Sequence, residues 1–301
     1  MRTRWKGCGT ALVTPFTRTG AVDESAVRRL ARRQIDSGVH FLVPCGTTGE
    51  TPTLTRAEHR RVVELVVEEA NGQVPVLAGA GGYNTQDVVE LTADMQRAGA
   101  DGVLSVTPYY NKPTPDGLLS HFRAIAESTD LPIIVYNVPS RTGCNVDTAT
   151  AVRLAAIPNI VGMKEASGNL TQICETCARV PADFAILSGD DVFTLPIMAV
   201  GARGVICTVS NTVPAEMARM VDAAERGDFA AARAIHTRLM PLMRVTFIES
   251  NPIPVKAEMA AMGLLEEQYR LPMVPPTDES RARILSVLRD LELIPAGAVH
   301  A

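Results

Sequence analysis

Lysine is scarce in this sequence, and the features of membrane and nucleic-acid-binding proteins are missing. Only four of the 29 lysine and arginine residues are lysines, and no basic block stands out in a chain with a net charge of −4. This charge balance argues against nucleic acid as a partner. No uninterrupted apolar run approaches the roughly 20 residues that a membrane span needs, and the N-terminus has no signal-peptide core. We therefore expect a cytosolic protein that acts on small molecules.

A cysteine pattern that would hold a metal ion is also missing. The six cysteines include one close pair, Cys174 and Cys177, without a second pair or nearby histidines to complete a zinc site. We interpret this pair as two neighbours on one helix, and the other cysteines as reduced thiols that pack in the interior. With 301 residues, of which 46% are hydrophobic, the chain can nonetheless bury a sizeable core.

Apolar runs of strand length recur eight times before residue 210. They span residues 8–13, 39–45, 74–80, 102–106, 132–136, 159–164, 184–188 and 204–209. Segments with helical spacing of apolar residues lie between them. The runs show little polar alternation, which is typical of parallel strands covered on both faces. Eight such units predict a closed (β/α)8 barrel, a TIM barrel of the α/β class.

A doubly wound open sheet is the structural alternative. It would normally bring a glycine-rich phosphate loop after its first strand, yet residues 14–17 read Thr-Pro-Phe-Thr. After Asp228 the strand runs cease and helical patterns take over, with Pro241 expected to kink the first of these helices. We therefore predict a barrel over residues 1–227 and a small C-terminal helical domain over residues 228–301.

One lysine, Lys164, closes the apolar run 159–164, where a buried strand should end. A charged ammonium in a low-dielectric interior costs several kcal/mol, so such a group tends to become the neutral amine that attacks carbonyl carbon and forms Schiff bases. The other lysines show no comparable setting in the sequence: Lys6 is near the N-terminus, Lys112 between prolines and Lys256 in a helical pattern. The alternative is a lysine whose stem packs while its head reaches water.

Residues that follow the other strands could act together with this lysine. Barrel enzymes gather their catalytic groups at the C-terminal ends of the strands. The turn Gly-Thr-Thr-Gly-Glu at 46–50 can aim backbone N–H groups and the hydroxyls of Thr47 and Thr48 at a carboxylate. Tyr136 should stand near Lys164, where its phenol could transfer protons. The alternative for the turn is a plain tight loop, and the alternative for Tyr136 is a half-buried aromatic side chain without a catalytic role.

Three loop residues extend this set. Arg141 lies just beyond the fifth run, where its guanidinium could hold the carboxylate of a second substrate, although most loop arginines face water. Tyr109 and Tyr110 follow the fourth run and could supply another phenol for proton transfer. Adjacent loop tyrosines more often make packing or subunit contacts.

Six motifs are highly specific when they are taken together. They are GTTGE at 46–50, TPYYNKP at 107–113, YNVPSRTG at 136–143, GMKEASGN at 162–169, LSGDD at 187–191 and NPIPVK at 251–256. On these motifs, and over nearly its whole length, the chain resembles the dihydrodipicolinate synthase family of the pyruvate-dependent class I aldolases. The resemblance implies a mechanism without metal or organic cofactor, and a homotetramer built as a pair of tight dimers.

The resemblance also implies roles for the residues singled out above. Lys164 would form the Schiff base with pyruvate, and Thr47 and Thr48 would bind the pyruvate carboxylate. Tyr136, Thr47 and Tyr110 would act as a proton relay, with Tyr110 entering the site of a neighbouring subunit.

The second substrate that the resemblance implies is L-aspartate 4-semialdehyde. Arg141 would bind its carboxylate, and the backbone around Gly189 and Ile206 would line the pocket. The protonated imine acidifies the pyruvate methyl group, and the resulting enamine attacks the aldehyde carbon. Ring closure would give 4-hydroxy-tetrahydrodipicolinate, an intermediate of diaminopimelate and lysine biosynthesis.

Other functions remain as alternatives. N-acetylneuraminate lyase and the 2-keto-3-deoxy sugar acid aldolases share the lysine and the tyrosine but accept polyhydroxylated aldehydes, for which a carboxylate-binding Arg141 would not be expected. A non-catalytic barrel that binds oxo acids as a sensor or scaffold would have little need for Lys164.

Feedback inhibition by lysine, bound at a subunit interface, is a trait of some family members. The corresponding positions here are Arg56, His59, Tyr83, Asp87 and Tyr109. His59, Asp87 and Tyr109 fit the pattern, whereas Arg56 and Tyr83 stand where sensitive bacterial members have histidine and asparagine. The added positive charge beside a cationic effector predicts weak or absent inhibition.

Overall fold

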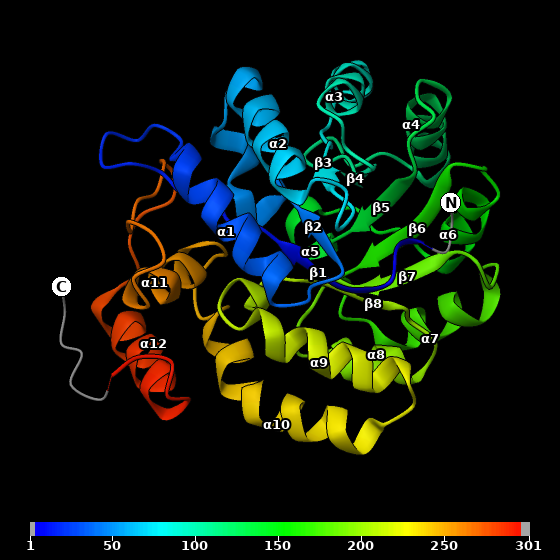
Figure 1. Cartoon of the computed structure of the whole chain (residues 1–301). Coiled ribbons are helices and arrows are strands. Elements are labelled where there is room, and N and C mark those ends of the chain that lie inside the picture. Colours follow the sequence, from blue (N-terminus) through cyan, green and yellow to red (C-terminus); the bar gives the residue numbers. More distant parts are fainter. Residues whose placement is uncertain (1–3, 296–301) are drawn as a thin grey trace.

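Eight parallel strands form the barrel that the sequence predicts (Figure 1), in a computed structural model that describes residues 4–295. The sheet runs in the order β2-β1-β8-β7-β6-β5-β4-β3, and a bridge from Leu42 to Val76 joins its two ends. The open-sheet alternative is therefore wrong. The strands are β1 Gly7–Ala11, β2 Phe41–Val43, β3 Leu77–Gly79, β4 Gly102–Val106, β5 Ile133–Asn137, β6 Ile160–Glu165, β7 Ala185–Ser188 and β8 Gly204–Cys207.

Helices surround the barrel and follow its strands in sequence. Local sequence explains their starts: Thr55 and Glu58, for example, form a capping box that satisfies free N–H groups at the start of the second helix. The helices are α1 Glu24–Asp36, α2 Arg56–Ala70, α3 Thr85–Arg97, α4 Pro115–Glu127, α5 Pro139–Thr142, α6 Thr148–Ala155, α7 Leu170–Arg179, α8 Thr194–Ala199 and α9 Pro214–Glu225.

The inside of the barrel is filled by apolar side chains from alternate strand positions. Phe41, Leu77, Leu104, Ile134 and Leu187 belong to this buried cluster, which Tyr136 and Ile206 also join. Each buried large apolar side chain stabilises the fold by roughly 1.5–3 kcal/mol. Because the interior is packed, the polar side chains that could bind a ligand are found at the strand ends.

Three more helices follow in the described part of the chain: α10 Phe229–Val245, α11 Ile253–Ala261 and α12 Asp278–Asp290. In Figure 1, α10 lies along α9, α11 lies near α1, and α12 packs against α11 and α10. Helix α10 continues through Pro241. Its start at Phe229 agrees with the end of the strand pattern, but the division into domains 1–227 and 228–301 stays a prediction. Residues 1–3 and 296–301 of those ranges lie outside the described residues.

Helix α11 is buried on every side. All seven residues from Ile253 to Met259 are buried. Its Val255 and Met259 form a hydrophobic cluster with Leu30 of α1 and Val13, which follows β1. This packing brings α11 to the carboxyl end of the barrel strands, since Val13 follows β1 at that end. No helix within residues 4–295 is both long and apolar enough to cross a membrane.

Candidate functional site

Lys164 and Tyr136 meet at the carboxyl ends of two neighbouring strands. They are register partners in the parallel β5-β6 pair. The Lys164 Nζ lies 4.2 Å from the centre of the Tyr136 ring. Lys164 is 7% exposed, and among the described residues no carboxylate forms an ion pair with it. The amine is thus buried against an aromatic ring without a fixed counter-ion, as an attacking amine requires.

Gly189, at the end of β7, leaves space for the Lys164 side chain. A Cβ added at Gly189 would lie 3.0 Å from the Lys164 Cε and 2.7 Å from the Ala166 Cβ, both too close. The Gly189 N–H donates a hydrogen bond to the Glu165 carbonyl at 2.7 Å. Glycine at this position therefore allows the strand ends to approach, and the structure brings two of the predicted residues, Lys164 and Gly189, into contact.

The Gly-Thr-Thr-Gly-Glu turn follows β2 and forms a short 3-10 helix, Thr47–Gly49. The Thr48 hydroxyl is buried: Asn251 Nδ2 donates a hydrogen bond to its Oγ1 at 2.9 Å. The Thr14 hydroxyl donates to the Gly49 carbonyl at 2.7 Å. Contacts from distant parts of the chain thus hold the turn, and sequence analysis missed the role of Asn251 although it recognised the motif that contains this residue.

A cavity of about 610 Å³ opens beside Tyr136. Thr47, which follows β2, and Tyr136 and Arg141, which lie at and just after the end of β5, all line it. Arg141 lies on the short helix α5 and is exposed, so its guanidinium can reach a ligand. The predicted pocket residue Ile206 is buried in the apolar cluster that contains Tyr136.

The two loop tyrosines behave differently. Tyr109 lines the cavity, and its ring meets the Tyr83 ring edge to face at 5.2 Å. Tyr110 is 92% exposed, has a left-handed backbone with φ of 69°, and is not among the cavity residues. One copy of the chain therefore does not bring Tyr110 to its own Lys164.

Four of the five predicted effector-site residues line the same cavity: Arg56, His59, Asp87 and Tyr109. The Arg56 guanidinium forms ion pairs with Asp94 and, at 3.0 Å, with Glu90. His59 Nε2 lies 2.9 Å from the Gly79 carbonyl oxygen, and burial lowers the pKa of His59, which favours the neutral ring. The predicted substrate and effector residues are thus continuous in space.

A second polar cluster holds the strands that carry Lys164 and Tyr136. Asn137 Nδ2 donates a hydrogen bond to Glu165 Oε2 at 3.1 Å, and the Ser167 N–H donates to Glu165 Oε1 at 2.6 Å. Burial raises the pKa of Glu165. Strand alternation could have indicated this cluster, because each residue directly follows a predicted catalytic one and must point to the opposite face.

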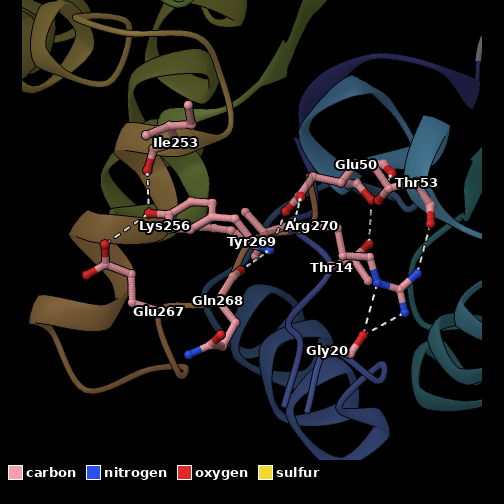
Figure 2. A network of polar contacts seen from close by, with 12 residues as sticks. Thr14, Gly20, Glu50, Thr53, Ile253, Lys256, Glu267, Gln268, Tyr269 and Arg270 are labelled. Carbon is pink, nitrogen blue, oxygen red and sulfur yellow. Dashed lines mark hydrogen bonds and ion pairs between the residues drawn. The ribbon is translucent and has the colours of Figure 1, made fainter. Parts of the chain in front are cut away.

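Lys256 corrects one expectation from the sequence. Its setting is comparable to that of Lys164, because the side chain is completely buried, with 0% exposed. It forms an ion pair with Glu50 and donates a hydrogen bond to the Gln268 carbonyl at 2.9 Å (Figure 2). Burial lowers the pKa of Lys256 to about 8, against the opposing effect of Glu50. Helical periodicity failed here because α11 has no exposed face.

Within residues 4–295, no group of three histidine, cysteine or acidic side chains could hold a metal ion. Cys174 and Cys177 lie together on α7, and all six cysteines are free.

Comparison with known proteins identifies the family. Residues 4–291 match the model of the dihydrodipicolinate synthetase family. The 4-hydroxy-tetrahydrodipicolinate synthase of Koribacter versatilis is 51% identical over 98% of both chains. The crystal structure of dihydrodipicolinate synthase from Aquifex aeolicus is 44% identical, has a TM-score of 0.95, and is matched over 97% of this chain and 100% of its own.

A further solved structure contains pyruvate. It is the chloride-inhibited dihydrodipicolinate synthase from Acinetobacter baumannii complexed with pyruvate, with 39% identity, a TM-score of 0.94, and coverage of 96% of this chain and 99% of its own. These matches extend over nearly the whole length and agree with the geometry at Lys164. The chain belongs to the dihydrodipicolinate synthetase family.

Proposed function

We propose that this chain condenses pyruvate with L-aspartate 4-semialdehyde to form 4-hydroxy-tetrahydrodipicolinate, in diaminopimelate and lysine biosynthesis. The single observation that carries the proposal is the Lys164 amine, 4.2 Å from the Tyr136 ring centre and without an ion-pair partner among the described residues. Relatives about half identical in sequence and named for this synthase activity support it, and so does the pyruvate complex of a structural neighbour.

The first half of the reaction takes place at Lys164. The neutral amine adds to the pyruvate ketone, and loss of water from the carbinolamine leaves a protonated imine. Tyr136 stands beside the amine and can transfer protons during these steps. The positive imine nitrogen withdraws electrons, so a methyl proton is lost and an enamine forms.

The second half adds the aldehyde. The enamine carbon attacks the semialdehyde carbonyl carbon, whose oxygen takes up a proton. The substrate's own amine then closes the ring and releases the Lys164 amine. We assign the proton relay to Tyr136, Thr47 and the partner subunit's Tyr110. The exposure of Tyr110 in the single chain supports a role in a neighbouring copy.

Substrate choice would rest on Arg141 and the two threonines. Thr47 and Thr48 would bind the pyruvate carboxylate, with Gly189 and Ile206 lining the pocket around Lys164. Arg141 lines the cavity with its guanidinium exposed, which suits a bidentate contact with the semialdehyde carboxylate. N-acetylneuraminate lyase activity is the second candidate that the lysine chemistry would allow, and Arg141 disfavours it.

We also propose a cytoplasmic homotetramer, a dimer of dimers. The free state of all six cysteines fits a reducing compartment. The Tyr83 and Tyr109 rings contact each other and are exposed, as is the neighbouring Tyr110, and such exposed aromatic side chains fit a subunit contact.

For regulation we propose weak or absent inhibition by lysine at the Arg56 side of the cavity. The guanidinium adds positive charge where a cationic effector would bind, although Asp94 and Glu90 offset part of it. We expect no half-inhibition below roughly 1 mM lysine, a range in which a well-matched charged site would already be occupied. Half-inhibition at submillimolar lysine in a steady-state assay would contradict the proposal.

Three measurements test the reaction. Borohydride added with pyruvate should reduce the imine and attach the pyruvate carbon skeleton to Lys164, which peptide mass spectrometry detects. A coupled assay with pyruvate should then show turnover of aspartate semialdehyde and little of N-acetylmannosamine. Arg141→Ala should raise KM for the semialdehyde by about ten- to a hundredfold and leave KM for pyruvate unchanged, because only one carboxylate loses its partner. A protein that gains no mass with pyruvate would refute the Schiff base.

A further inference from the structure

Glu50 ends the Gly-Thr-Thr-Gly-Glu turn in an unusual backbone conformation. Its φ is 51° and its ψ 34°, in the left-handed region that residues other than glycine seldom adopt. It closes the 3-10 helix that contains Thr47 and Thr48, and begins the next one, Thr51–Thr53. The conformation must be held by tertiary contacts, because the local sequence does not favour it.

Those contacts come from the C-terminal part of the chain. The Glu50 carboxylate forms an ion pair with Lys256 and accepts a hydrogen bond from the Arg270 N–H at 3.2 Å (Figure 2). The Lys256 Nζ also lies 4.2 Å from the centre of the Phe16 ring. Both charged side chains are almost completely removed from water, so each depends on the other for a counter-charge.

A second contact joins the same two segments. Asn251, five residues before Lys256, donates its Nδ2 hydrogen to Thr48 Oγ1 at 2.9 Å. The Thr48 oxygen then acts as acceptor, so its own proton can be donated to the Thr208 hydroxyl, whose oxygen lies 3.5 Å away, or to a ligand carboxylate that replaces this long contact. Asn251 Oδ1 is buried and has no hydrogen-bond partner. The turn residues 48 and 50 are therefore both held by the segment 251–256.

A buried ion pair adds little net stability compared with apolar side chains that pack in the same space. Its benefit is geometric, because each charge tolerates only a small displacement of the other in a low-dielectric environment. An ion pair at the end of the turn, rather than in the apolar core, restricts where the Thr47 and Thr48 hydroxyls can lie.

We propose that Lys256 is a positioning residue for the pyruvate carboxylate, which acts through Glu50 and, with Asn251, holds the Thr47–Thr48 turn in its binding geometry. The C-terminal helical segment is then part of the active site and not only an appendage. The inference rests on the proposed function, since it concerns the substrate that the turn binds. Lys256 itself touches no substrate.

The test compares Lys256→Met, Glu50→Gln, their double variant and Lys6→Met. Lys6→Met is the matched control, because it removes the same side chain from an exposed ion pair with Glu225. For each variant, the thermal midpoint, both KM values and the pyruvate concentration that gives half-maximal borohydride trapping are measured.

Lys256→Met should raise KM for pyruvate and the half-trapping concentration by about tenfold, with KM for the semialdehyde within about twofold of wild type. The double variant should be no worse than Lys256→Met, because it removes the unpaired buried carboxylate. Lys6→Met should leave all these values unchanged. A lower thermal midpoint with unchanged pyruvate values would overturn the proposal and assign Lys256 a purely structural role.

Three further outcomes are decisive. If Lys256→Met does not fold, Glu50→Gln and Asn251→Ser replace it, and the proposal requires each to weaken pyruvate trapping more than semialdehyde binding. If the wild-type protein is not trapped by borohydride with pyruvate, the proposed function fails. If wild type is trapped, and the variants are trapped at the same pyruvate concentration, only the positioning role of Lys256 fails.

Discussion

Two of the four lysines are buried near the same end of the barrel, and they differ in the groups that surround their amines. Lys164 faces the Tyr136 ring, and no carboxylate among residues 4–295 pairs with it. Lys256 is enclosed by Glu50, the Gln268 carbonyl and the Phe16 ring. The first amine can react with a ketone, whereas the second is held as a counter-charge. Burial alone therefore does not identify a nucleophilic lysine.

The surroundings of the two lysines explain why one is suited to chemistry. Lys164 belongs to a strand end next to a cavity-lining tyrosine, with Gly189 leaving room for its stem. Lys256 belongs to a helix buried on every side. Although burial lowers the pKa of Lys256 to about 8, its side chain is completely buried, whereas 7% of Lys164 is exposed. Access and a free lone pair matter together.

The largest expected effect comes from replacing each of the two buried lysines by methionine. Lys164→Met should lower kcat by at least about a thousandfold and abolish borohydride trapping, because covalent catalysis is lost. Lys256→Met should remain trappable at high pyruvate. Peptide mass spectrometry after reduction checks both. Retained turnover in Lys164→Met, or a pyruvate adduct on Lys256, would reverse the assignment of roles.

The aromatic neighbour of Lys164 gives the next largest effect. Tyr136→Phe should lower kcat by about a hundred- to a thousandfold, because a proton-transferring phenol is lost while the ring remains. KM for pyruvate should change little. Tyr269→Phe is a matched control at the other lysine, since the Tyr269 ring centre lies 5.6 Å from Lys256 Nζ. Equal losses in both variants would mean that the phenol at Tyr136 has no special role.

The smallest effect is a difference in stability with pH. Folding lowers the pKa of Lys256 from its ordinary 10.5 to about 8, mainly by burial, with Glu50 opposing and Arg270 assisting. Between these values the unfolded chain binds more protons, so this group favours the folded state increasingly as pH rises from 8 to 10.5. The thermal midpoint of wild type minus that of Lys256→Met should therefore increase by a few degrees over this range. A constant difference would show that the lysine keeps its ordinary titration.

Much of the site could be predicted from sequence because barrel topology converts sequence position into spatial position. Lys164 is the last residue but one of β6 and Tyr136 the last but one of β5, and consecutive parallel strands are neighbours in register. Thr47 follows β2 and Arg141 follows β5, and both reach the cavity that Tyr136 lines. The roles of Tyr110 in a neighbouring copy and of Gly189 and Ile206 in binding stay predictions.

The contacts that the remaining residues make could not be found from local patterns. Asn137 and Glu165 follow the catalytic candidates directly, yet only the folded barrel shows that their side chains hydrogen-bond to each other at 3.1 Å. The apolar spacing of α11 predicts a helix but not how much of it is covered, and here Lys256 has no solvent-exposed face to occupy. A helical pattern cannot indicate burial on all sides.

The sequence by itself determined the barrel, the order of its strands and the lysine at the sixth strand end. Those features depend on apolar runs and on covalent order, which the sequence states directly. Only the tertiary structure decided that Asn251 meets Thr48 and that Lys256 meets Glu50, across separations of 203 and 206 residues. Such contacts arise when α11 packs against α1 and the end of β1, and no local propensity encodes where two distant segments will meet.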